Sequence, residues 1–400
     1  MKVAVITPDN FPPDIRIERE VRTLLASGYE LCIYASDKTP VSKRVSNYLR
    51  AKVVYLNYKI IKGFSFMDWR ELLSVLGEFN PDAVHIHNPQ IFVQGYLAAR
   101  KLKAKVVFDN HELWTVFSLF SKVSYPLRLP LLLIYFVLEL VAAKVSDVVI
   151  TVSEDMKDTL HRVFRVNKKK IFAVENFEEV SLLSSLESNL NKPSLTSVGN
   201  DKFVVCYMGG TEEHRGLRYL LESLKYIESS VLDKILILIV GDMSENLRET
   251  ISRLPKNLSS KVVVTGFLPF NSALAFLKKA DIAVIPYEKN AYTMYALPNK
   301  ASIYLYFRKP VLATELRTLK RYFGNAMYFV PEPHPRKFAE GIVKLYYDKQ
   351  LRESLATKGY NLIVRRNNWE YTSQKLKKIY QMFEISINKN KTFLHDLHVR

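Results

Sequence analysis

Short apolar runs alternate with amphipathic segments along most of the chain. In the first 175 residues, segments such as Arg16–Ser27 and Trp69–Phe79 carry apolar residues at helical spacing, and each lies between two apolar runs. This alternation predicts β-α-β units and a parallel sheet. The expected strands are Val3–Thr7, Glu30–Tyr34, Lys52–Leu56, Ala83–His87, Lys105–Phe108 and Asp147–Val152.

The same alternation resumes after residue 202. Helices are expected at Gly216–Ile227, Asn271–Lys279 and Asn299–Phe307, and a last helix at about Glu370–Phe383. The expected strands are Phe203–Met208, Ile235–Val240, Lys261–Thr265, Ile282–Pro286, Pro310–Ala313 and Ala326–Val330.

The two halves predict an α/β protein with two doubly wound, Rossmann-like domains. We expect an N-terminal domain at 1–175 and a second domain at 203–370. Residues 176–202 are expected to form a linker, because 181–201 is rich in Ser and Asn and lacks periodicity. Residues 371–400 are expected to be a helix that packs back on the first domain, followed by a basic tail. The predicted cleft lies between the carboxyl-end loops of the two sheets.

Composition narrows the class of protein. With 48% hydrophobic and 24% charged residues, the chain of 400 residues is typical of an ordered globular protein. Cys32 and Cys206 each lie in an apolar run, so we expect two core thiols in a reducing compartment. The chain opens directly with a strand, which favours a cytoplasmic protein, at the inner face of the cell membrane if it binds lipid.

The net charge of +18 indicates anionic partners. The basic residues are dispersed through ordered segments and form no recognition motif, so we expect no nucleic-acid partner. Nucleoside diphosphates, phospholipid headgroups and phosphate-linked acceptors account for the charge equally well.

Polar side chains follow two neighbouring strands of the first predicted sheet. His85 and His87 lie in one strand, and the run Asp109-Asn110-His111-Glu112 is expected as the loop that ends the next. Ligands of open parallel sheets bind beyond the carboxyl ends of the strands, so this edge is the expected active site. The spacing His-x-His also suits a metal-dependent hydrolase, with His111 and Asp109 as further ligands, although no additional carboxylate cluster completes a coordination shell.

Four glycine or cation motifs end strands or begin helices in the second half. Glycines let the backbone approach a phosphate, and Arg215 and Lys300 supply positive charge. Together the motifs predict a nucleoside-diphosphate site. They are Gly209-Gly210 with Arg215-Gly216, Gly241-Asp242, Gly266-Phe267, and Pro298-Asn299-Lys300.

One apolar segment, Leu129–Ala143, contains a single charged residue, Glu139. It is shorter than a spanning helix requires. It is either a buried helix of the first domain or a helix in the membrane interface, with Glu139 paired to a neighbour in the first case. The second interpretation rests on the aromatic and basic residues just upstream, which are Phe117, Phe120, Lys122, Tyr125 and Arg128.

The ordered set of motifs resembles the GT-B glycosyltransferases, specifically the retaining enzymes of glycosyltransferase family 4. The resemblance extends from Met1 to about Phe383. In the first half it rests on Asp14-Ile15-Arg16, His85-Ile86-His87, Asp109–Leu113, Ile150–Glu154 and Asn176. In the second half it rests on Gly209-Gly210, Arg215-Gly216-Leu217, Gly241-Asp242, Gly266-Phe267 and Leu297–Lys300.

The resemblance implies a nucleoside-diphosphate sugar as co-substrate, bound by the second domain. Arg215 would contact the diphosphate, and Gly266–Leu268 would lie near the base. No metal or other cofactor is implied, because protein cations and backbone donors stabilise the leaving diphosphate. The implied donor-binding residues are Gly209, Gly210, Arg215, Gly241, Asp242, Gly266, Phe267, Leu268, Pro298, Asn299 and Lys300.

The first domain would bind a glycan or a lipid-linked acceptor. The implied acceptor-binding residues are Arg16, His85 and His87, and the implied catalytic residues are His111 and Glu112. The sugar would be transferred with retention of configuration.

Three positions depart from the family. The first loop is Asn10-Phe11-Pro12-Pro13, where the family often has glycines. Tyr295 and Ile303 replace two glutamates, and Ile303 cannot accept hydrogen bonds from ribose hydroxyls. Arg308 replaces a glycine. These departures leave open a second interpretation, a catalytically inactive GT-B-like binding or regulatory subunit.

Overall fold

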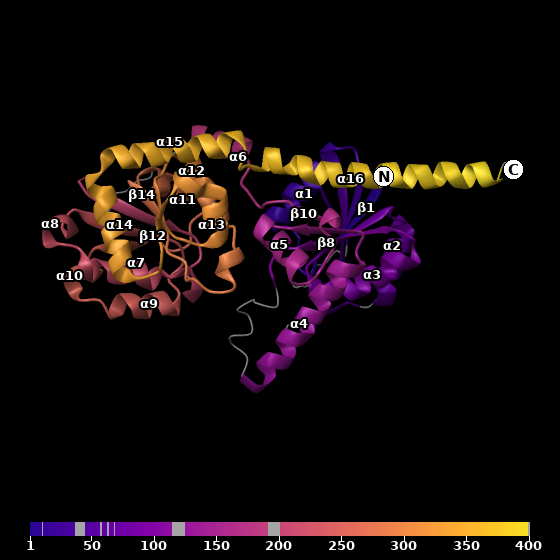
Figure 1. Cartoon of the computed structure of the whole chain (residues 1–400), viewed down its shortest axis with the longest axis horizontal. Helices are drawn as coiled ribbons and strands as arrows, with labels where there is room; N and C mark the ends of the chain where they lie inside the picture. Colours follow the sequence, from indigo (N-terminus) through magenta and orange to yellow (C-terminus); the bar gives the residue numbers. More distant parts are fainter. Residues whose placement is uncertain are drawn as a thin grey trace. The chain divides into compact units, whose positions relative to one another are not determined.

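The computed structural model describes residues 1–9, 11–36, 45–56, 58–61, 64–67, 69–113, 125–190 and 201–398. The chain forms two compact units (Figure 1). The first unit contains Met1–Asn176 and Thr372–Arg400, and the second contains Phe177–Tyr371. Each unit is an α/β fold built on its own parallel sheet.

The first unit has an eight-stranded sheet in the order β10-β9-β8-β7-β1-β2-β4-β3. All neighbours are parallel except β3 and β4. The strands are β1 (Lys2–Ile6), β2 (Glu30–Ser36), β3 (Val45–Tyr48), β4 (Ala51–Leu56), β7 (Ala83–His87), β8 (Lys105–Asn110), β9 (Val148–Thr151) and β10 (Ile171–Ala173); β5 (Tyr58–Ile61) and β6 (Phe64–Met67) form a separate hairpin.

Helices connect these strands. They are α1 (Ile15–Ala26), α2 (Trp69–Phe79), α3 (Phe92–Lys101), α4 (Tyr125–Val145) and α5 (Glu154–Arg162), with the short helices η1 (Pro89–Ile91) and η4 (Lys168–Lys170). The long helix α16 (Trp369–His398) belongs to the first unit from Thr372 onward. The side chain of Asp14 caps α1 by accepting a 3.0 Å hydrogen bond from the Ile17 amide, and Gly28, with φ of 84°, follows its C-terminal end.

The second unit has a six-stranded, wholly parallel sheet in the order β13-β12-β11-β14-β15-β16. The strands are β11 (Phe203–Met208), β12 (Ile235–Val240), β13 (Val262–Val264), β14 (Ile282–Ile285), β15 (Val311–Thr314) and β16 (Tyr328–Val330). Strand β12 is Ile-Leu-Ile-Leu-Ile-Val and fully buried, as is typical of a parallel strand covered on both faces.

Ten helices and four short helical turns surround this sheet within the described residues. The helices are α6 (Val180–Ser188), α7 (Leu217–Ser223), α8 (Ser229–Leu232), α9 (Glu245–Ser252), α10 (Lys256–Ser259), α11 (Phe270–Lys278), α12 (Asn299–Tyr306), α13 (Arg317–Phe323), α14 (Pro335–Tyr347) and α15 (Lys349–Arg365); the turns are η5 (Glu213–Arg215), η6 (Leu224–Tyr226), η7 (Thr293–Tyr295) and η8 (Gly324–Ala326).

Strand order identifies where each sheet offers a ligand site. In the first unit, β1 lies between β2 and β7, and in the second, β11 lies between β12 and β14. At each of these points the chain changes direction across the sheet, which leaves a crevice at the carboxyl ends of the strands. The polar motifs of the sequence therefore lie at the edges where this fold binds ligands.

The predicted fold class is confirmed, and each predicted strand and helix begins within a few residues of an observed element. The last helix is longer than predicted: α16 continues past Phe383 to His398, through the expected basic tail. Two other expectations were wrong in detail. Asp109 and Asn110 do not begin a loop but continue β8, because their side chains have buried partners. The predicted linker contains helix α6, which buries Leu183 in the core of the second unit.

Helix α4 contains the apolar segment Leu129–Ala143. Within the first unit it extends away from the sheet at its N-terminal end (Figure 1). Tyr135, Glu139, Ala142 and Ala143 are buried, whereas the opposite face of the helix is exposed, so the helix is not a fully buried one. None of the helices in the described ranges is long and apolar enough to cross a membrane.

Candidate active site and anion site

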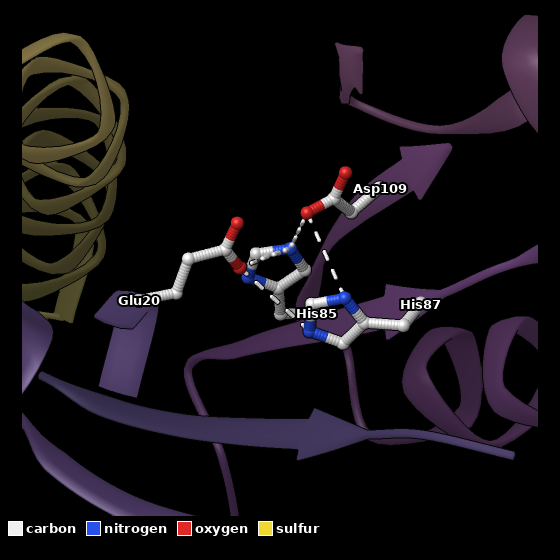
Figure 2. Close-up of side chains that lie close together, drawn as sticks. All are labelled: Glu20, His85, His87 and Asp109. Atoms are coloured by element: carbon white, nitrogen blue, oxygen red, sulfur yellow. Dashed lines mark ion pairs between the residues drawn. The ribbon is translucent and has the colours of Figure 1, made fainter. Parts of the chain in front are cut away.

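Five buried side chains form a cluster at the carboxyl edge of the first sheet. Arg16 and Glu20 lie one turn apart on α1. Figure 2 shows Glu20 beside His85 and His87 of β7, with Asp109 of β8 next to both histidines. All five are at most 4% exposed. We call these residues the Arg16 cluster.

A bidentate ion pair holds the Arg16 cluster together. Arg16 Nη2 lies 3.0 Å from both carboxylate oxygens of Asp109, and Arg16 Nη1 donates to the carbonyl of Val174 at 3.0 Å. Arg16 Nη2 also lies 3.1 Å from Glu20 Oε1. The one guanidinium therefore bridges α1, β8 and the end of β10.

The two carboxyl groups of the cluster have opposite pKa shifts. Burial works against the charged form of Asp109, but the Arg16 charge and the nearby imidazoles of His111 and His85 outweigh it and hold the pKa of Asp109 well below the usual range. Burial and the neighbouring Asp109 charge raise the pKa of Glu20 well above its usual value. Asp109 is therefore the charged partner of Arg16, and Glu20 favours the neutral acid.

The two cluster histidines are neutral imidazoles. His85 and His87 stack with ring centroids 4.5 Å apart. Burial lowers the pKa of both, and the neighbouring His85 lowers that of His87 further. The hydroxyl of Tyr380, on α16, shares a 2.8 Å hydrogen bond with His85 Nδ1, so the C-terminal helix helps to fix this ring.

His111 connects the cluster to the surface. Its Nε2 shares a 2.9 Å hydrogen bond with His87 Nδ1, and its side chain is 18% exposed. Glu112, the next residue, is also partly exposed. The structure thus brings the predicted site residues Arg16, His85, His87 and His111 together, with His111 as the member that reaches solvent.

The three predicted acceptor-binding residues are buried in this conformation. Arg16, His85 and His87 are at most 4% exposed, and each lies within 3.6 Å of an Asp109 carboxylate oxygen. Their contact with an acceptor stays a prediction, while His87 holds His111 by a hydrogen bond.

The same cluster offers ligand atoms for a metal ion. One ligand atom each from Glu20, His85, His87 and Asp109 lies within 4.8 Å of the others. The nitrogens His85 Nε2 and His87 Nε2 both lie 3.8 Å from Glu20 Oε2 and have no hydrogen-bond partner in the described part of the chain. However, Arg16 already supplies positive charge to both carboxyl groups, and a cation here would be repelled by it.

A second cluster lies after β11 in the second unit. Gly209 has φ of 126°, a conformation that L side chains rarely adopt, and a Cβ there would lie 2.8 Å from Lys300 Nζ. The ammonium of Lys300 is buried 3.9 Å from the centre of the Tyr207 ring, and no described residue offers it a hydrogen bond. Burial and the nearby Arg215 charge hold the pKa of Lys300 well below its usual range.

Arg215 supplies a second cation to the same place. Its guanidinium packs 5.0 Å from the centre of the Tyr287 ring and donates to the Tyr287 hydroxyl. Its Nε lies 3.2 Å from Glu212 Oε2, and Glu212 is more than half exposed. Lys300 also lies 5.4 Å from the Tyr287 ring centre. We call Arg215, Lys300 and the Gly209-Gly210 turn the anion site.

Close backbone approaches explain two of the other glycines. A Cβ on Gly241 would lie 2.2 Å from the Gly209 carbonyl oxygen, and one on Gly216 would lie 2.0 Å from the Pro286 carbonyl oxygen. Gly241 thus lies against the anion site, and the exposed Asp242 follows it. Pro298 and Asn299 begin the helix that carries Lys300.

The turn after β13 has a different character. Gly266 has φ of 76°, Phe267 is 78% exposed and Leu268 is half-buried. An exposed aromatic ring at a strand end is suited to stacking on a planar group.

The family departures have structural consequences. Ile303 is 5% exposed and belongs to the core of the second unit, so no carboxylate occupies that position. Arg308 adopts φ of 52° at the end of α12, a position that favours glycine. Its guanidinium lies 3.6 Å from the centre of the Tyr360 ring. Asn10 lies outside the described residues.

Two protein-family models match the chain. The model for Glycosyltransferase Family 4 matches residues 15–178, and the model for Glycosyl transferases group 1 matches residues 202–348. Between them they cover most of both units. The chain belongs to the GT-B glycosyltransferases, as the sequence motifs predicted.

Individual relatives agree with this assignment. An uncharacterized glycosyltransferase of Methanocaldococcus jannaschii is 21% identical over 327 residues, which are 80% of each chain. A sucrose-phosphate synthase from Thermosynechococcus elongatus superposes with a TM-score of 0.76 at 16% identity, over 96% of this chain and 100% of that one. The Anabaena protein HepE in complex with UDP-glucose superposes with a TM-score of 0.66 at 13% identity, over 96% and 100% of the two chains.

Sequence reasoning missed three groups that complete these sites. Glu20 lies one helical turn after Arg16, and this spacing was the available signal. Tyr380 carried no signal, because its partner His85 is 295 residues away. The Tyr207 ring lies beside Lys300 and the Tyr287 ring beside both cations, and only the sheet brings these residues together.

The opposite pKa shifts of Glu20 and Asp109 predict opposite results for the same chemical change. Asp109→Asn leaves the buried Arg16 charge without its partner and should cost about 3–5 kcal/mol of unfolding free energy. Glu20→Gln keeps the neutral shape that burial already favours and should change stability by less than about 1 kcal/mol. Denaturant unfolding at neutral pH measures both.

The pH dependence gives a further check of the same pair. Because the folded-state pKa of Glu20 is raised, wild-type stability should fall relative to Glu20→Gln as pH rises from the unfolded pKa of a glutamate, about 4.3, through the folded value. Equal losses from the two substitutions would contradict this assignment of charge.

Proposed function

We propose that the protein transfers a sugar from a nucleoside-diphosphate sugar to a glycan or lipid-linked acceptor, with retention of configuration and without a divalent metal. The second unit binds the donor, and His111 acts at the transferred sugar and the acceptor hydroxyl. The buried, unsatisfied ammonium of Lys300 beside Arg215 is the observation that carries the proposal.

A diphosphate satisfies what the anion site lacks. A buried ammonium without a hydrogen-bond acceptor is costly, and a phosphate oxygen supplies both acceptor and negative charge. A side chain on Gly209 would collide with the Lys300 ammonium, since its Cβ would lie 2.8 Å from Lys300 Nζ. Because glycine has no side chain, a phosphate can approach the backbone of this turn and Lys300 closely. Glu212, which pairs with Arg215 in this structure, is exposed enough to be replaced by the incoming phosphate.

The other donor contacts follow from the same arrangement. Phe267, after β13, is positioned to stack on the base, with Gly266 and Leu268 on either side. The bound UDP-glucose of the HepE complex supports a nucleotide sugar as the ligand of this fold. Because Ile303 offers no hydrogen bond to ribose, binding here relies more on the diphosphate than on the sugar hydroxyls of the nucleoside.

In the first unit the chemistry falls to His111. Its Nε2 shares a hydrogen bond with His87 Nδ1, which fixes the orientation of the His111 ring. The ring is still partly exposed to solvent. An imidazole in this state can hydrogen-bond a sugar or acceptor hydroxyl and stabilise charge as the diphosphate leaves. Glu112 is adjacent and partly exposed, and it completes the proposed catalytic pair.

The alternative is a GT-B protein that binds ligand without turnover. Ile303 and Tyr295 favour this alternative, since they stand at the two positions where the family has glutamates. The release of nucleoside diphosphate from a nucleotide sugar, measured in the presence of acceptor extract, distinguishes the two functions. Tight donor binding with no release under any acceptor condition would establish the inactive subunit.

Loss of either cation should weaken donor binding. Arg215→Ala and Lys300→Met should each reduce nucleoside-diphosphate affinity about 10–100-fold, the scale of a charge-assisted hydrogen bond. Arg218→Ala is the matched control, because Arg218 lies on the next helix and pairs with Glu288 at 2.8 Å instead. Calorimetry with UDP and GDP measures all three, and unchanged affinity in the first two variants would remove them from the site.

The same titration reports on Lys300 itself. Its pKa is depressed without ligand, so phosphate binding should raise the pKa and take up a proton from solution. Affinity should therefore fall as pH rises above the unliganded pKa. The apparent binding enthalpy should depend on the ionisation enthalpy of the buffer in the wild type and lose that dependence in Lys300→Met.

His111 should matter for turnover and not for nucleotide binding. His111→Ala is expected to lower kcat by about 100-fold or more while the nucleoside-diphosphate affinity stays within a factor of about two. His161→Ala is the control, since His161 lies in the same unit and its Nδ1 contacts the Val166 carbonyl. Near-normal turnover in His111→Ala would assign His111 a structural role.

Activity should survive removal of divalent metals. Protein treated with a chelator and exchanged into metal-free buffer should retain its rate, because Arg215 and Lys300 stabilise the leaving diphosphate. If activity were lost and restored by a divalent ion, metal independence would be wrong. Glu20→Gln would then show whether the metal sits in the Arg16 cluster, because it removes one of the four ligands.

A further inference from the structure

The solvent-facing side of α4 is almost entirely apolar. Among the residues of this helix between 126 and 145 whose exposure is described, nine are exposed, and eight of these are apolar. Leu129, Leu133, Val137, Val141 and Val145 repeat every four residues, so they form one stripe along the helix. The exposed set is Pro126, Leu129, Pro130, Leu133, Ile134, Val137, Val141, Lys144 and Val145.

These are not marginal exposures. Leu129 is 75% exposed and Leu133 62% exposed. Exposed apolar residues scattered singly are ordinary, but a continuous stripe of this length marks an interaction surface. The sole acidic residue of the helix, Glu139, is fully buried and accepts a 2.8 Å hydrogen bond from Asn110. The outward face of α4 therefore carries no negative charge.

A basic segment packs beside the C-terminal half of α4. Phe164 contacts Phe136 of the helix edge-to-face, with ring centroids 5.0 Å apart. Lys170 Nζ donates to the carbonyls of Lys144 and Ser146 at the end of the helix. These contacts fix the basic segment against the apolar stripe within the first unit.

The charge of this segment has one sign. Residues 159–170 contain five basic side chains and no acidic one. Arg162 and Arg165 line an open depression of about 500 Å³, and Val163 between them is 61% exposed. Lys168 and Lys169 are exposed on the following turn. Apolar and cationic side chains thus adjoin on one side of the unit.

We propose that α4 and residues 159–170 form a peripheral docking surface for an anionic lipid bilayer. The apolar stripe enters the headgroup boundary, and the basic segment contacts the negative surface of the leaflet. This combination favours a bilayer as the occupant, because a long aliphatic face bordered by positive charge complements both the apolar and the anionic regions of a leaflet. The proposal extends the sequence expectation to a defined surface; Phe117, Phe120 and Lys122 lie outside the described residues.

The surface is tested with the full-length protein and two kinds of vesicle. Flotation with phosphatidylglycerol vesicles at low salt should recover the protein, and flotation with phosphatidylcholine vesicles should recover much less. Lys168→Gln with Lys169→Gln should lower the partition coefficient about 30-fold, because each cation near an anionic surface contributes about one factor of five. Lys256→Gln with Lys279→Gln, exposed cations of the second unit, should have little effect.

The apolar stripe has its own variants. Leu133→Glu with Val137→Glu should reduce binding at least about tenfold, since both side chains would bring charge into the headgroup region. Leu49→Glu is the control, because Leu49 is 63% exposed on the turn between β3 and β4, at the other edge of the sheet. Unchanged thermal unfolding in all variants confirms that the fold is intact.

Three results would overturn the proposal. One is a wild-type protein that stays out of the anionic vesicles at low salt. Another is binding that responds to the lysine variants and not to the α4 variants, which is electrostatic attraction alone. The third is a dimer, detected by light scattering, that the α4 variants dissociate, because the stripe would then be covered by a second copy. Nucleoside-diphosphate affinity should be the same in every variant, so failure here is distinct from failure of the proposed function.

Discussion

The first unit depends on the buried ion pair between Arg16 and Asp109. A guanidinium and a carboxylate this deeply buried are stable only because each satisfies the other bidentately. The pair joins the first helix to β8 and, through Val174, to the end of β10. It also affects the charge of Glu20, because burial and the neighbouring Asp109 charge raise the pKa of Glu20 and favour the neutral acid. Burial lowers the pKa of His85 and His87, against the opposing effect of the Asp109 charge. The resulting rigid cluster holds His111 at the edge of the sheet.

The second unit uses buried charge in the opposite way. Arg16 is fully paired, whereas Lys300 has neighbouring rings but no hydrogen-bond acceptor among the described residues, and Arg215 is paired with an exposed carboxylate. A buried cation without a hydrogen-bond acceptor is costly, and an anionic ligand would supply the acceptor that Lys300 lacks. This contrast, more than the fold, is the physical argument for an anionic substrate.

The sequence predicted the elements well because both sheets are parallel and buried on two faces. Strands such as β12 and β14 are then continuous apolar runs, which the pattern alone identifies. It failed where a local pattern is weak or absent. Helix α6 buries only Leu183, and β3 is a short antiparallel edge strand with no buried position, so neither gives a periodic signal.

The site was predictable to the level of residue types but not of roles. His85, His87 and His111 were identified from their places at strand ends, and they do lie together. The burial of His85 and His87 comes from α1 and α16 packing over them, through Glu20 and Tyr380. Contacts between residues so far apart in the chain cannot be predicted from the pattern of a single sequence.

The charge state of the histidines tests this account most directly. Nitrogen NMR of protein labelled in its imidazoles follows the protonation and tautomer of each ring across pH. The account predicts that His85 and His87 protonate only below the ordinary histidine pKa, near 6.5, and that His87 Nδ1 and His111 Nε2 share one hydrogen bond. Titration of His87 with an ordinary histidine pKa, near 6.5, would contradict it.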